Sequence, residues 1–373
     1  MAQYLPLAID AMGGDKAPKS VIRGLQIMHS KQPNRKFLLY GDEKTLQRYL
    51  DAKPMKSLRN ACEIIHTNVV ISDDEKPSIA VRQAKNSSMR MSIQAVKDGK
   101  ACGVVSSGNT GAFMALSKMI LRTLPSIYRP ALTGLMPNRG SSIVMLDIGA
   151  NVQCDANDLF LFALMGDSYS RVMLQKDNPK VALLNIGSEE MKGHETLHIV
   201  AENLRSTSTI NFKGYVEGND ICNGDVDVVV TDGFTGNIAL KTLEGTARYF
   251  SAELKQALSK SWTGKLGYML ARPAFAVMKR RLDPRRYNGA MFLGLDGIAI
   301  KSHGGSDGYA FYHAMKKAYI LADCDINSRL TAELARHNLG NQNSQQPHFS
   351  ATAGDVMATN NQLANNHSVA IQG

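Results

Sequence analysis

Short apolar runs alternate with longer segments of helical spacing over most of the chain. Val228–Val230 is a β-branched run, as expected for a strand buried on both faces of a parallel sheet. A turn at Asp232–Asn237 follows, and Ile238 begins a segment with helical spacing. The same unit recurs. The pattern predicts strands at 6–10, 36–40, 61–66, 102–105, 142–146, 180–185, 228–230 and 297–301. It predicts helices at 19–31, 43–52, 79–98, 157–175 and 309–336, and others that end near 121 or begin near 195 and 238.

Strands that alternate with helices predict a doubly wound α/β fold, in which ligands bind outside the carboxyl ends of the strands. Five turns that combine glycine with Ser, Asn, Asp or Thr are expected to line one edge of the sheet and to form a site there. A turn that leads into a helix N-terminus presents free backbone N–H groups, which suit an anion such as phosphate. For turn 232–237 taken alone, the alternative is an ordinary turn with Thr235 as the helix N-cap.

Two common nucleotide-binding motifs, GxGxxG and GxxxxGK[ST], do not occur, which argues against dehydrogenases and NTPases. Gly304–Gly308 does match GxSxG, the nucleophile elbow of esterases. A serine hydrolase would need an acid and a histidine downstream. The candidates are Asp323, Asp325 and His337, which lie within about one helix of chain and leave too little room for the strands of a hydrolase. We therefore expect Ser306 and His303 to bind an anion or to cap the helix.

The chain has 373 residues, of which 44% are apolar and 20% charged, so we expect a globular protein with a sizeable core. No run of about 18 apolar residues is present, which argues against a membrane span. The N-terminus lacks the basic and apolar regions of a secretion signal, and the five cysteines form no CxxC pair. These features favour a cytoplasmic protein without a zinc site or a disulfide framework.

The net charge of +10 predicts an acidic partner, and most of the excess lies in segment 248–287. Basic and apolar residues alternate there at helical spacing, so we expect a helical hairpin that contacts an anionic membrane or an acidic protein. The alternative is a solvated pair of surface helices. Nucleic acid is less favoured, because few aromatic residues are available to stack on bases. The candidate contact residues are Lys265, Arg272, Lys279, Arg280 and Arg281.

The composition changes near residue 338. Residues 338–373 are rich in Asn and Gln and lack apolar periodicity, so we expect a disordered tail with no role in the chemistry. Residues 1–337 would then form the α/β domain, with the basic hairpin inside it.

Lys192 lies directly after the turn that follows the predicted strand 180–185. One interpretation is a solvated surface lysine. The other is that its ammonium, together with the amide of Asn237, stabilises an oxyanion at a substrate carbonyl. The neighbouring His194 is ambiguous, and we do not expect it to act as a general base.

Seven motifs follow one another in an order that is specific to one family. They are AIDAMGGD at 8–15, SSGNTGA at 106–112, LDIGAN at 146–151, LLNIGSEEMKGHE at 183–195, VEGNDI at 216–221, VVVTDGFTGNIALKTLEG at 228–245 and GIAIKSHGGSD at 297–307. From about Leu5 to Ala335 the chain resembles the phosphate acyltransferases of bacterial phospholipid synthesis (PlsX-type). His194 stands where this family usually has Asn, and Gly305 where it usually has Ser.

This resemblance implies transfer of a fatty acyl group from acyl carrier protein to inorganic phosphate, which gives an acyl phosphate for a glycerol-3-phosphate acyltransferase. It also implies an isocitrate/isopropylmalate-dehydrogenase-like fold and a homodimer attached peripherally to the inner face of the cell membrane. No metal or redox cofactor is expected.

Phosphate is already a nucleophile at neutral pH, so the expected reaction needs positioning and oxyanion stabilisation rather than a covalent intermediate. We expect Lys192 and Asn237 to polarise the thioester carbonyl, and Asp232 and Asn151 to order them. The expected phosphate- and substrate-binding residues are Ser106, Ser107, Gly108, Asn109, Thr110, Asn151, Gly236, His303 and Ser306.

Three alternatives stay open at this point. A phosphotransacetylase would use the same chemistry on a short acyl-CoA, but it has no evident need for the basic hairpin. A serine esterase or thioesterase would use Ser306 as its nucleophile. A non-catalytic scaffold would need the hairpin but not the polar turns.

Overall fold

The computed structural model describes residues 5–52, 55–140 and 142–343 of the chain. The chain divides into two compact units, residues 1–333 and 334–373. The described part of the second unit belongs to helix α12 (Ile326–Asn343). Residues 338–343, which the sequence pattern assigns to the tail, are therefore helical, and the rest of the predicted tail, 344–373, lies outside the described residues.

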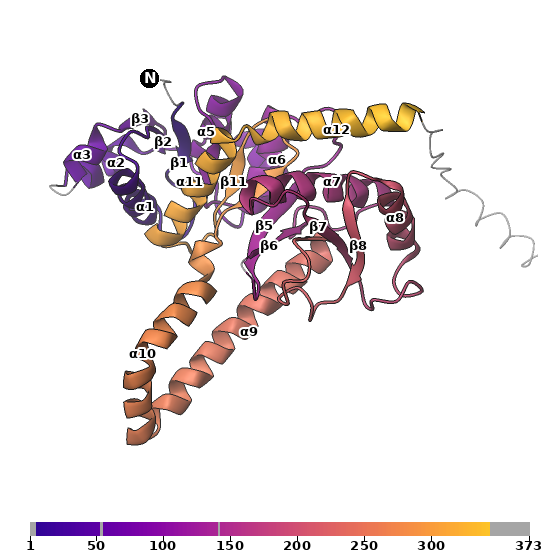
Figure 1. Ribbon diagram of the computed structural model, residues 1–373. Helices are drawn as coiled ribbons and strands as arrows, with labels where there is room; N and C mark the ends of the chain where they lie inside the picture. The colour runs from indigo at the N-terminus through magenta and orange to yellow at the C-terminus, as the bar shows by residue number, and fades with distance from the viewer. Residues whose placement is uncertain (1–4, 53–54, 141, 344–373) are drawn as a thin grey trace, which may run out of the picture. The chain divides into compact units, whose positions relative to one another are not determined.

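One sheet of eleven strands runs through the first unit, within the described residues (Figure 1). The strands are β1 (Leu7–Asp10), β2 (Phe37–Gly41), β3 (Cys62–His66), β4 (Val104–Ser106), β5 (Ala131–Pro137), β6 (Ser142–Leu146), β7 (Lys180–Leu184), β8 (Asn211–Val216), β9 (Val228–Val230), β10 (Ala290–Leu293) and β11 (Ala299–Lys301). Their order across the sheet is β3-β2-β1-β4-β11-β10-β5-β6-β9-β7-β8. β1, β4, β9 and β11 are buried along their whole length, as expected for strands covered on both faces.

Two strands reverse the direction of the sheet. β10 pairs antiparallel with both β11 and β5, and β5 pairs antiparallel with β6. The other described strand pairings are parallel. Because three antiparallel pairings lie between β11 and β6, the group β6, β7, β8 and β9 runs opposite to the group β1, β2, β3, β4 and β11. The carboxyl ends of the two groups therefore lie at opposite edges of the sheet.

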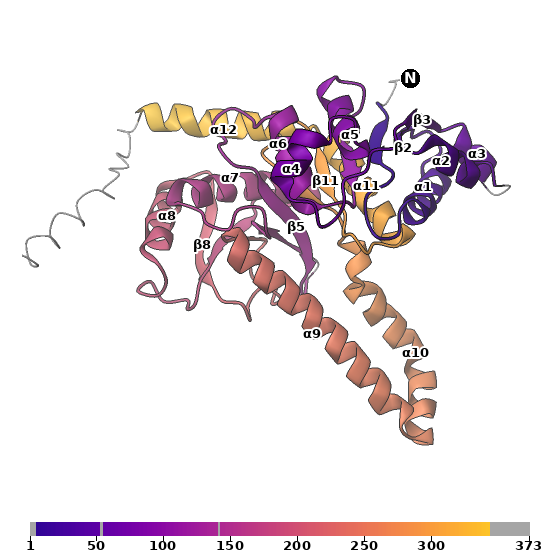
Figure 2. The same cartoon turned by 180° about the vertical axis from the view of Figure 1, so that it is seen from behind.

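Helices cover both faces of the sheet. Those of the first unit are α1 (Lys19–Lys31), α2 (Glu43–Leu50), α3 (Lys56–Arg59), α4 (Pro77–Gln83), α5 (Ser88–Lys97), α6 (Thr110–Leu121), α7 (Ala156–Met173), α8 (Glu195–Ser206), α9 (Gly233–Ser259), α10 (Trp262–Leu282) and α11 (Gly308–Asp323), with a 3-10 turn at Pro284–Arg286. α1 packs against α11 on one face, and α4 and α5 pack against α6 on the other (Figures 1 and 2). The fold is therefore mixed α/β with one large central sheet.

Local capping explains where the sequence pattern gives wrong helix boundaries. The predicted helix 79–98 is two helices, because Ser87 caps α5 by accepting a hydrogen bond from Arg90 N (3.2 Å). The predicted helix 309–336 is also divided, since Asp325 adopts a positive φ of 47° between α11 and α12. α9 begins at Gly233 rather than near 238, with Asp232 and not Thr235 as its N-cap. The pattern does not predict β5, β8 or β10.

α9 and α10 form an antiparallel hairpin (Figures 1 and 2). Among its described residues only Gly233 and Gly236, at the start of α9, are buried, and α10 has no buried residue. Ser261 caps α10 and so ends the connection between the two helices. No helix in the described part of the chain is both long enough and apolar enough to cross a bilayer.

Candidate functional site

A first polar cluster, the Lys301 cluster, lies at the carboxyl ends of the neighbouring strands β1, β4 and β11. It consists of Asp10, Ser106, Ser107, Lys301, Ser302 and Ser306. The Asp10 carboxylate is 1% exposed and accepts hydrogen bonds from Ser88 Oγ (2.7 Å) and Ser106 Oγ (2.6 Å). Burial raises the pKa of Asp10, although both hydroxyls oppose this. Asp10 thus connects β1 to α5 and β4.

Lys301 is a buried lysine at the end of β11, with 8% of the residue exposed. Its ammonium donates to the carbonyl of Ser302 and to that of Ser107 (3.4 Å), so it joins the turns after β11 and β4. Burial lowers the pKa of Lys301 to about 8, while Asp73 and two further carboxylates favour the charged form. The turns predicted to bind phosphate therefore contain a buried lysine that is mostly charged at neutral pH.

Ser107 supplies an unsatisfied group at the same place. Within the described residues its buried Oγ has no hydrogen-bond partner, and such groups are rare because burying them is costly. Gly14 allows the turn after β1 to lie against Ser107, since its φ is 95° and a Cβ there would come within 2.7 Å of Ser107 Cβ. The Ser107 hydroxyl is therefore available to a bound group.

The other predicted phosphate residues after β4 have structural partners or face solvent. The hydroxyl of Ser106, which donates to the buried carboxylate of β1, also accepts from Gly108 N (3.1 Å). Asn109 caps α6 with its side-chain oxygen, and its amide nitrogen donates to carbonyls of loop 72–75. Thr110 is exposed in the first turn of α6. Asn109 thus fixes a neighbouring loop with the groups that it would need to hold phosphate.

Ser306 and His303 lie in the turn after β11. The buried Ser306 Oγ is 3.0 Å from Ser302 Oγ, which accepts from Asn288 Nδ2 (2.8 Å). The exposed His303 ring accepts from Gly305 N through Nδ1 (3.1 Å). Among the described side chains no histidine contacts the Ser306 hydroxyl, so the GxSxG match does not form the Ser–His pair of an esterase there.

A second polar cluster, the Lys192 cluster, lies at the carboxyl ends of β6, β9 and β7, which are also neighbours. It consists of Asp147, Asn151, Lys192, Asp232 and Asn237. The buried Asp147 carboxylate accepts from the backbone N–H groups of residues 149–151, at 2.7 to 3.0 Å, and from Asn151 Nδ2 (2.8 Å). Burial raises the pKa of Asp147, although these hydrogen bonds oppose it. Asp147 therefore organises its own turn.

The turn after β9 packs directly on the turn after β6. Gly233 N donates to Asn151 O (2.7 Å). A Cβ on Gly236 would lie 1.9 Å from Asp147 O, so only glycine permits this approach. The predicted binding residues Asn151 and Gly236 thus hold two turns together.

Asp232 and Asn237 belong to the start of α9. Asp232 accepts from a backbone N–H of the first turn (2.8 Å), and the half-buried Asn237 lies against Gly149. Lys192, in the turn after β7, is exposed, and Asn185 Nδ2 fixes its backbone by donating to Lys192 O (2.8 Å). The structure therefore places the two predicted oxyanion donors on adjacent turns, with the lysine side chain open to solvent.

The two clusters lie at opposite edges of the sheet, because the strands that carry them run in opposite directions. β4 and β6 are four positions apart in the strand order, which corresponds to about 19 Å at the usual spacing. The prediction that five turns line one edge is wrong. Of the predicted phosphate residues, Ser106, Ser107 and Ser306 gather in one cluster. Lys192, Asn237, Asp232 and Asn151 gather in the other.

Sequence reasoning missed Asp10, Asp147 and Lys301. Each is a charged residue at the end of an apolar strand or directly after one. An apolar run that ends in a charge is a usable signal, because a buried charge is costly unless it is paired and hydrogen-bonded.

Cys154 lies close to the Lys192 cluster, with its Sγ 3.9 Å from Asn151 O. Burial raises the pKa of Cys154 to about 12, so it is a protonated thiol at neutral pH and a poor nucleophile. In the part of the chain that the structure describes, no group of three His, Cys, Asp or Glu side chains is placed to hold a metal ion.

Comparison with known proteins identifies the family. A family model described as fatty acid synthesis protein matches residues 5–329. The chain belongs to this family. Relatives of this chain include the phosphate acyltransferases of Paramagnetospirillum magneticum and Rhodospirillum rubrum, each 48% identical over 337 residues. The matches cover 90% of this chain and 95% and 96% of the two relatives.

Solved structures resemble this chain in fold. A phosphotransacetylase from Streptococcus pyogenes has a TM-score of 0.58 at 16% identity, over 87% of this chain and 95% of that one. A branched-chain phosphotransacylase from Enterococcus faecalis has a TM-score of 0.54 at 12% identity, over 85% and 99%. At these identities the likeness is evidence for the fold alone.

Proposed function

We propose that this protein transfers a long-chain fatty acyl group from acyl carrier protein to inorganic phosphate and so forms an acyl phosphate. The names of its relatives support phosphate as the acceptor. The observation that carries the proposal is the buried Lys301 ammonium beside the unpartnered Ser107 hydroxyl. A cation and a hydroxyl at adjacent strand ends suit a small anion. The acyl phosphate would serve a glycerol-3-phosphate acyltransferase.

In this reaction a phosphate oxygen attacks the thioester carbonyl, and a new C–O bond forms. The tetrahedral intermediate carries an oxyanion, for which Lys192 and Asn237 are the proposed donors. Its collapse breaks the C–S bond, and the departing thiolate takes a proton to become the carrier-protein thiol. The protonated Cys154 thiol fits a route without a covalent enzyme intermediate.

The proposed homodimer would let the two clusters share one reacting carbonyl. Within one chain they lie at opposite edges, but the Lys192 cluster of one copy could face the Lys301 cluster of the other. The surface near Lys192 and Asn237 is accessible to a second copy, since the side chains of Met191 and Phe234 are 93% and 60% exposed. The isocitrate/isopropylmalate-dehydrogenase-like subtype of the fold is part of this proposal.

Mixing two variants of strongly reduced activity tests the shared site. If Lys192→Ala and Lys301→Met affect different halves of one composite site, a mixed dimer keeps one intact site. Subunit exchange should then restore up to about a quarter of wild-type activity, because half of the dimers are mixed and each has one good site. No recovery despite demonstrated exchange would contradict sharing.

The hairpin of α9 and α10 is proposed to hold the protein on an anionic membrane and to contact the acidic carrier protein. The proposed contact residues Lys265, Arg272, Lys279, Arg280 and Arg281 are all exposed. Arg281 also has a structural role, since its guanidinium donates to Asn138 O (2.9 Å) and to Arg139 O. Changing Lys279 and Arg280 to Glu should abolish sedimentation with anionic vesicles, and salt should weaken the wild type. Unchanged sedimentation would contradict the membrane contact.

Phosphate-dependent release of thiol from palmitoyl carrier protein tests the reaction itself. Release only with phosphate is the expected result, and release without phosphate would indicate a thioesterase instead. A phosphotransacetylase, which would use the same chemistry on a short acyl-CoA, is the alternative that the same assay tests. Activity on acetyl-CoA but not on palmitoyl carrier protein would favour it.

A further inference from the structure

The segment that follows α10, residues 283–289, holds the turn after β11, and we call it the strap. Asn288 makes three of the contacts. Its Nδ2 donates to Ser302 Oγ (2.8 Å) and to Ala310 O (2.8 Å), and its Oδ1 accepts from His303 N (3.0 Å). One side chain thus fixes both the start of the turn and the first turn of α11.

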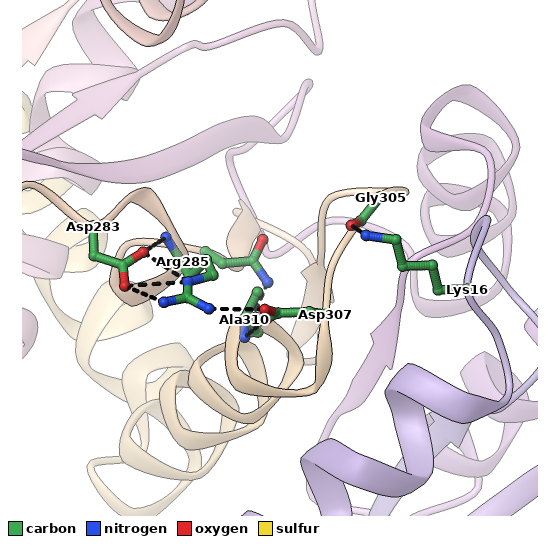
Figure 3. A network of polar contacts seen from close by, with 7 residues as sticks. Lys16, Asp283, Arg285, Gly305, Asp307 and Ala310 are labelled. Carbon is green, nitrogen blue, oxygen red and sulfur yellow. Dashed lines mark hydrogen bonds and ion pairs between the residues drawn. The ribbon is translucent and has the colours of Figure 1, made fainter. Parts of the chain in front are cut away.

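Arg285 gives the strap a second hold on the same turn (Figure 3). Its guanidinium donates to Asp283 Oδ2 (2.7 Å) and to Asp307 Oδ2 (2.9 Å). The other oxygen of Asp307 accepts from Ala310 N (2.9 Å) and so caps α11. The guanidinium also lies over the Tyr309 ring, 5.1 Å from its centroid. Arg285 therefore connects the strap to the residue that ends the turn.

The strap and the turn are both anchored from outside. The buried ammonium of Lys317 donates to the carbonyls of residues 287 (3.1 Å) and 289. On the other side of the turn, Lys16 Nζ donates to Gly305 O (2.9 Å), as Figure 3 shows. The turn is therefore held between the strap and the turn after β1.

We propose that Arg285 and Asn288 are positioning residues for phosphate. They set the geometry of the turn that carries His303 and Ser306, and they act through this turn rather than by touching phosphate. The inference rests on the proposed function, in which phosphate binds at the Lys301 cluster. Because the strap continues directly from α10, the same contacts connect the base of the hairpin to the phosphate site.

Kinetics distinguish positioning from mere support of the fold. If a residue only stabilises the fold, its substitution should lower the melting temperature and affect all kinetic parameters together. If a residue positions the turn that binds phosphate, its substitution should raise the KM for phosphate. The KM for acyl carrier protein and kcat should stay within about twofold of the wild type. Arg285 is suited to this test, because its side chain is 45% exposed and its loss leaves no cavity in the core.

The first experiment compares Arg285→Gln with Arg286→Gln. The neighbouring Arg286 donates to Arg280 O (3.1 Å) and is the matched control. We expect the KM for phosphate to rise roughly threefold to tenfold in Arg285→Gln, the range of a partly exposed ion pair, and to stay unchanged in Arg286→Gln. Arg285→Lys should fall between, because an ammonium cannot bridge both carboxylates as the planar guanidinium does.

A second variant tests the route through α11. Asp307→Asn keeps an N-cap side chain but removes the charge. It should reproduce the Arg285→Gln effect, and the double variant should be no worse than either single one, because both break the same contact. Additive effects would overturn the proposed pair. A lower melting temperature and kcat, with the two KM values changed to the same extent, would overturn positioning.

Binding of inorganic phosphate, measured by the rise of the melting temperature with phosphate concentration, separates this inference from the proposed function. A smaller rise in Arg285→Gln than in the wild type supports positioning even if the wild type shows no phosphate-dependent turnover, a result that would overturn the function alone. An equal rise, together with an unchanged KM for phosphate, would overturn the inference and leave the function standing.

Discussion

The Lys301 cluster and the Lys192 cluster are both built around a buried aspartate at the end of a strand, but the balance of its hydrogen-bond partners differs. Asp10 takes its side-chain partners from other elements, Ser88 at the start of α5 and Ser106 of β4. Asp147 takes most of its partners from the backbone of its own turn, residues 149–151. Asp10 thus connects three elements, in addition to the backbone N–H groups of its own turn. Asp147 mainly shapes one turn and also holds β5 through Leu132 N (3.1 Å).

The two lysines differ in the same sense. Lys301 is 8% exposed, and its ammonium joins two turns. Lys192 is exposed, and its backbone rather than its ammonium is held. Exposed apolar residues surround the Lys192 cluster, among them Ile186 at 80% and Met191 at 93%. A closed, prearranged cluster suits a small anion, and an open one with an apolar rim suits a large partner or substrate.

The largest expected effect comes from the open cluster. Lys192→Ala should lower kcat by about 10²-fold or more, the scale of one lost oxyanion donor. The melting temperature should not change, because the side chain is exposed. Turnover of palmitoyl carrier protein and thermal unfolding measure the two effects. Lys213→Ala, an exposed lysine on β8, is the matched control and should keep wild-type turnover. Near-normal kcat in Lys192→Ala would leave this cluster with a structural role only.

The sequence predicts the turn residues of both clusters, but neither their three buried charged residues nor the separation of the clusters. The separation depends on the two strands that reverse the sheet, β5 and β10. β5 contains Gly134 and ends at Pro137, which weakens its strand pattern, and the pattern also leaves out β10. Without them all the strands are taken to be parallel, and every polar turn falls at one edge.

Burial of charge is a tertiary property and is equally hard to predict. Lys301 is buried because β4 and β10 flank β11 in the sheet. The sequence of β11 alone does not contain this information. The sequence distinguishes the N-cap of α9 less sharply, since Asp232 and Thr235 are both residue types that favour this position. The structure has Asp232, one residue before the helix, as the cap. Patterns along the chain thus predict the turns, whereas the neighbouring strands in the sheet determine which side chains are buried.

A change in the contact between the turns of the open cluster should have an intermediate effect. Gly236→Ala places a Cβ 1.9 Å from Asp147 O, so it must displace the start of α9. We expect the free energy of unfolding to fall by about 2 kcal/mol, in the range of overpacked sites. Chemical denaturation measures this change.

Gly245→Ala, in the same helix, is the control for that substitution. Nothing lies within 4 Å of the added Cβ, so the change should raise stability by about 0.5–1 kcal/mol through helix propensity alone. Equal effects of the two substitutions would mean that the two turns do not depend on close contact, and the Lys192 cluster would then be looser than the structure indicates.

A further effect concerns the closed cluster and depends on pH. Burial lowers the pKa of Lys301 from 10.5 to about 8, so between these values the unfolded state binds more protons than the folded state. The contribution of Lys301 to the free energy of unfolding should therefore rise with pH through this window. Lys301→Met should remove this rise, which thermal unfolding of both proteins from about pH 8 to pH 10 measures.

Phosphate affinity should change in the opposite direction over the same window. The charged fraction of Lys301 falls from about one half at pH 8 to about a tenth at pH 9, while inorganic phosphate stays mainly a dianion. If this ammonium holds phosphate, the KM for phosphate should rise about fivefold in the wild type and stay flat in Lys301→Met. A KM for phosphate that does not change with pH in the wild type would mean that phosphate does not bind at the Lys301 ammonium. If the free energy of unfolding rises with pH while the affinity for phosphate falls, phosphate binds at Lys301, because a gain in stability cannot explain a loss of affinity.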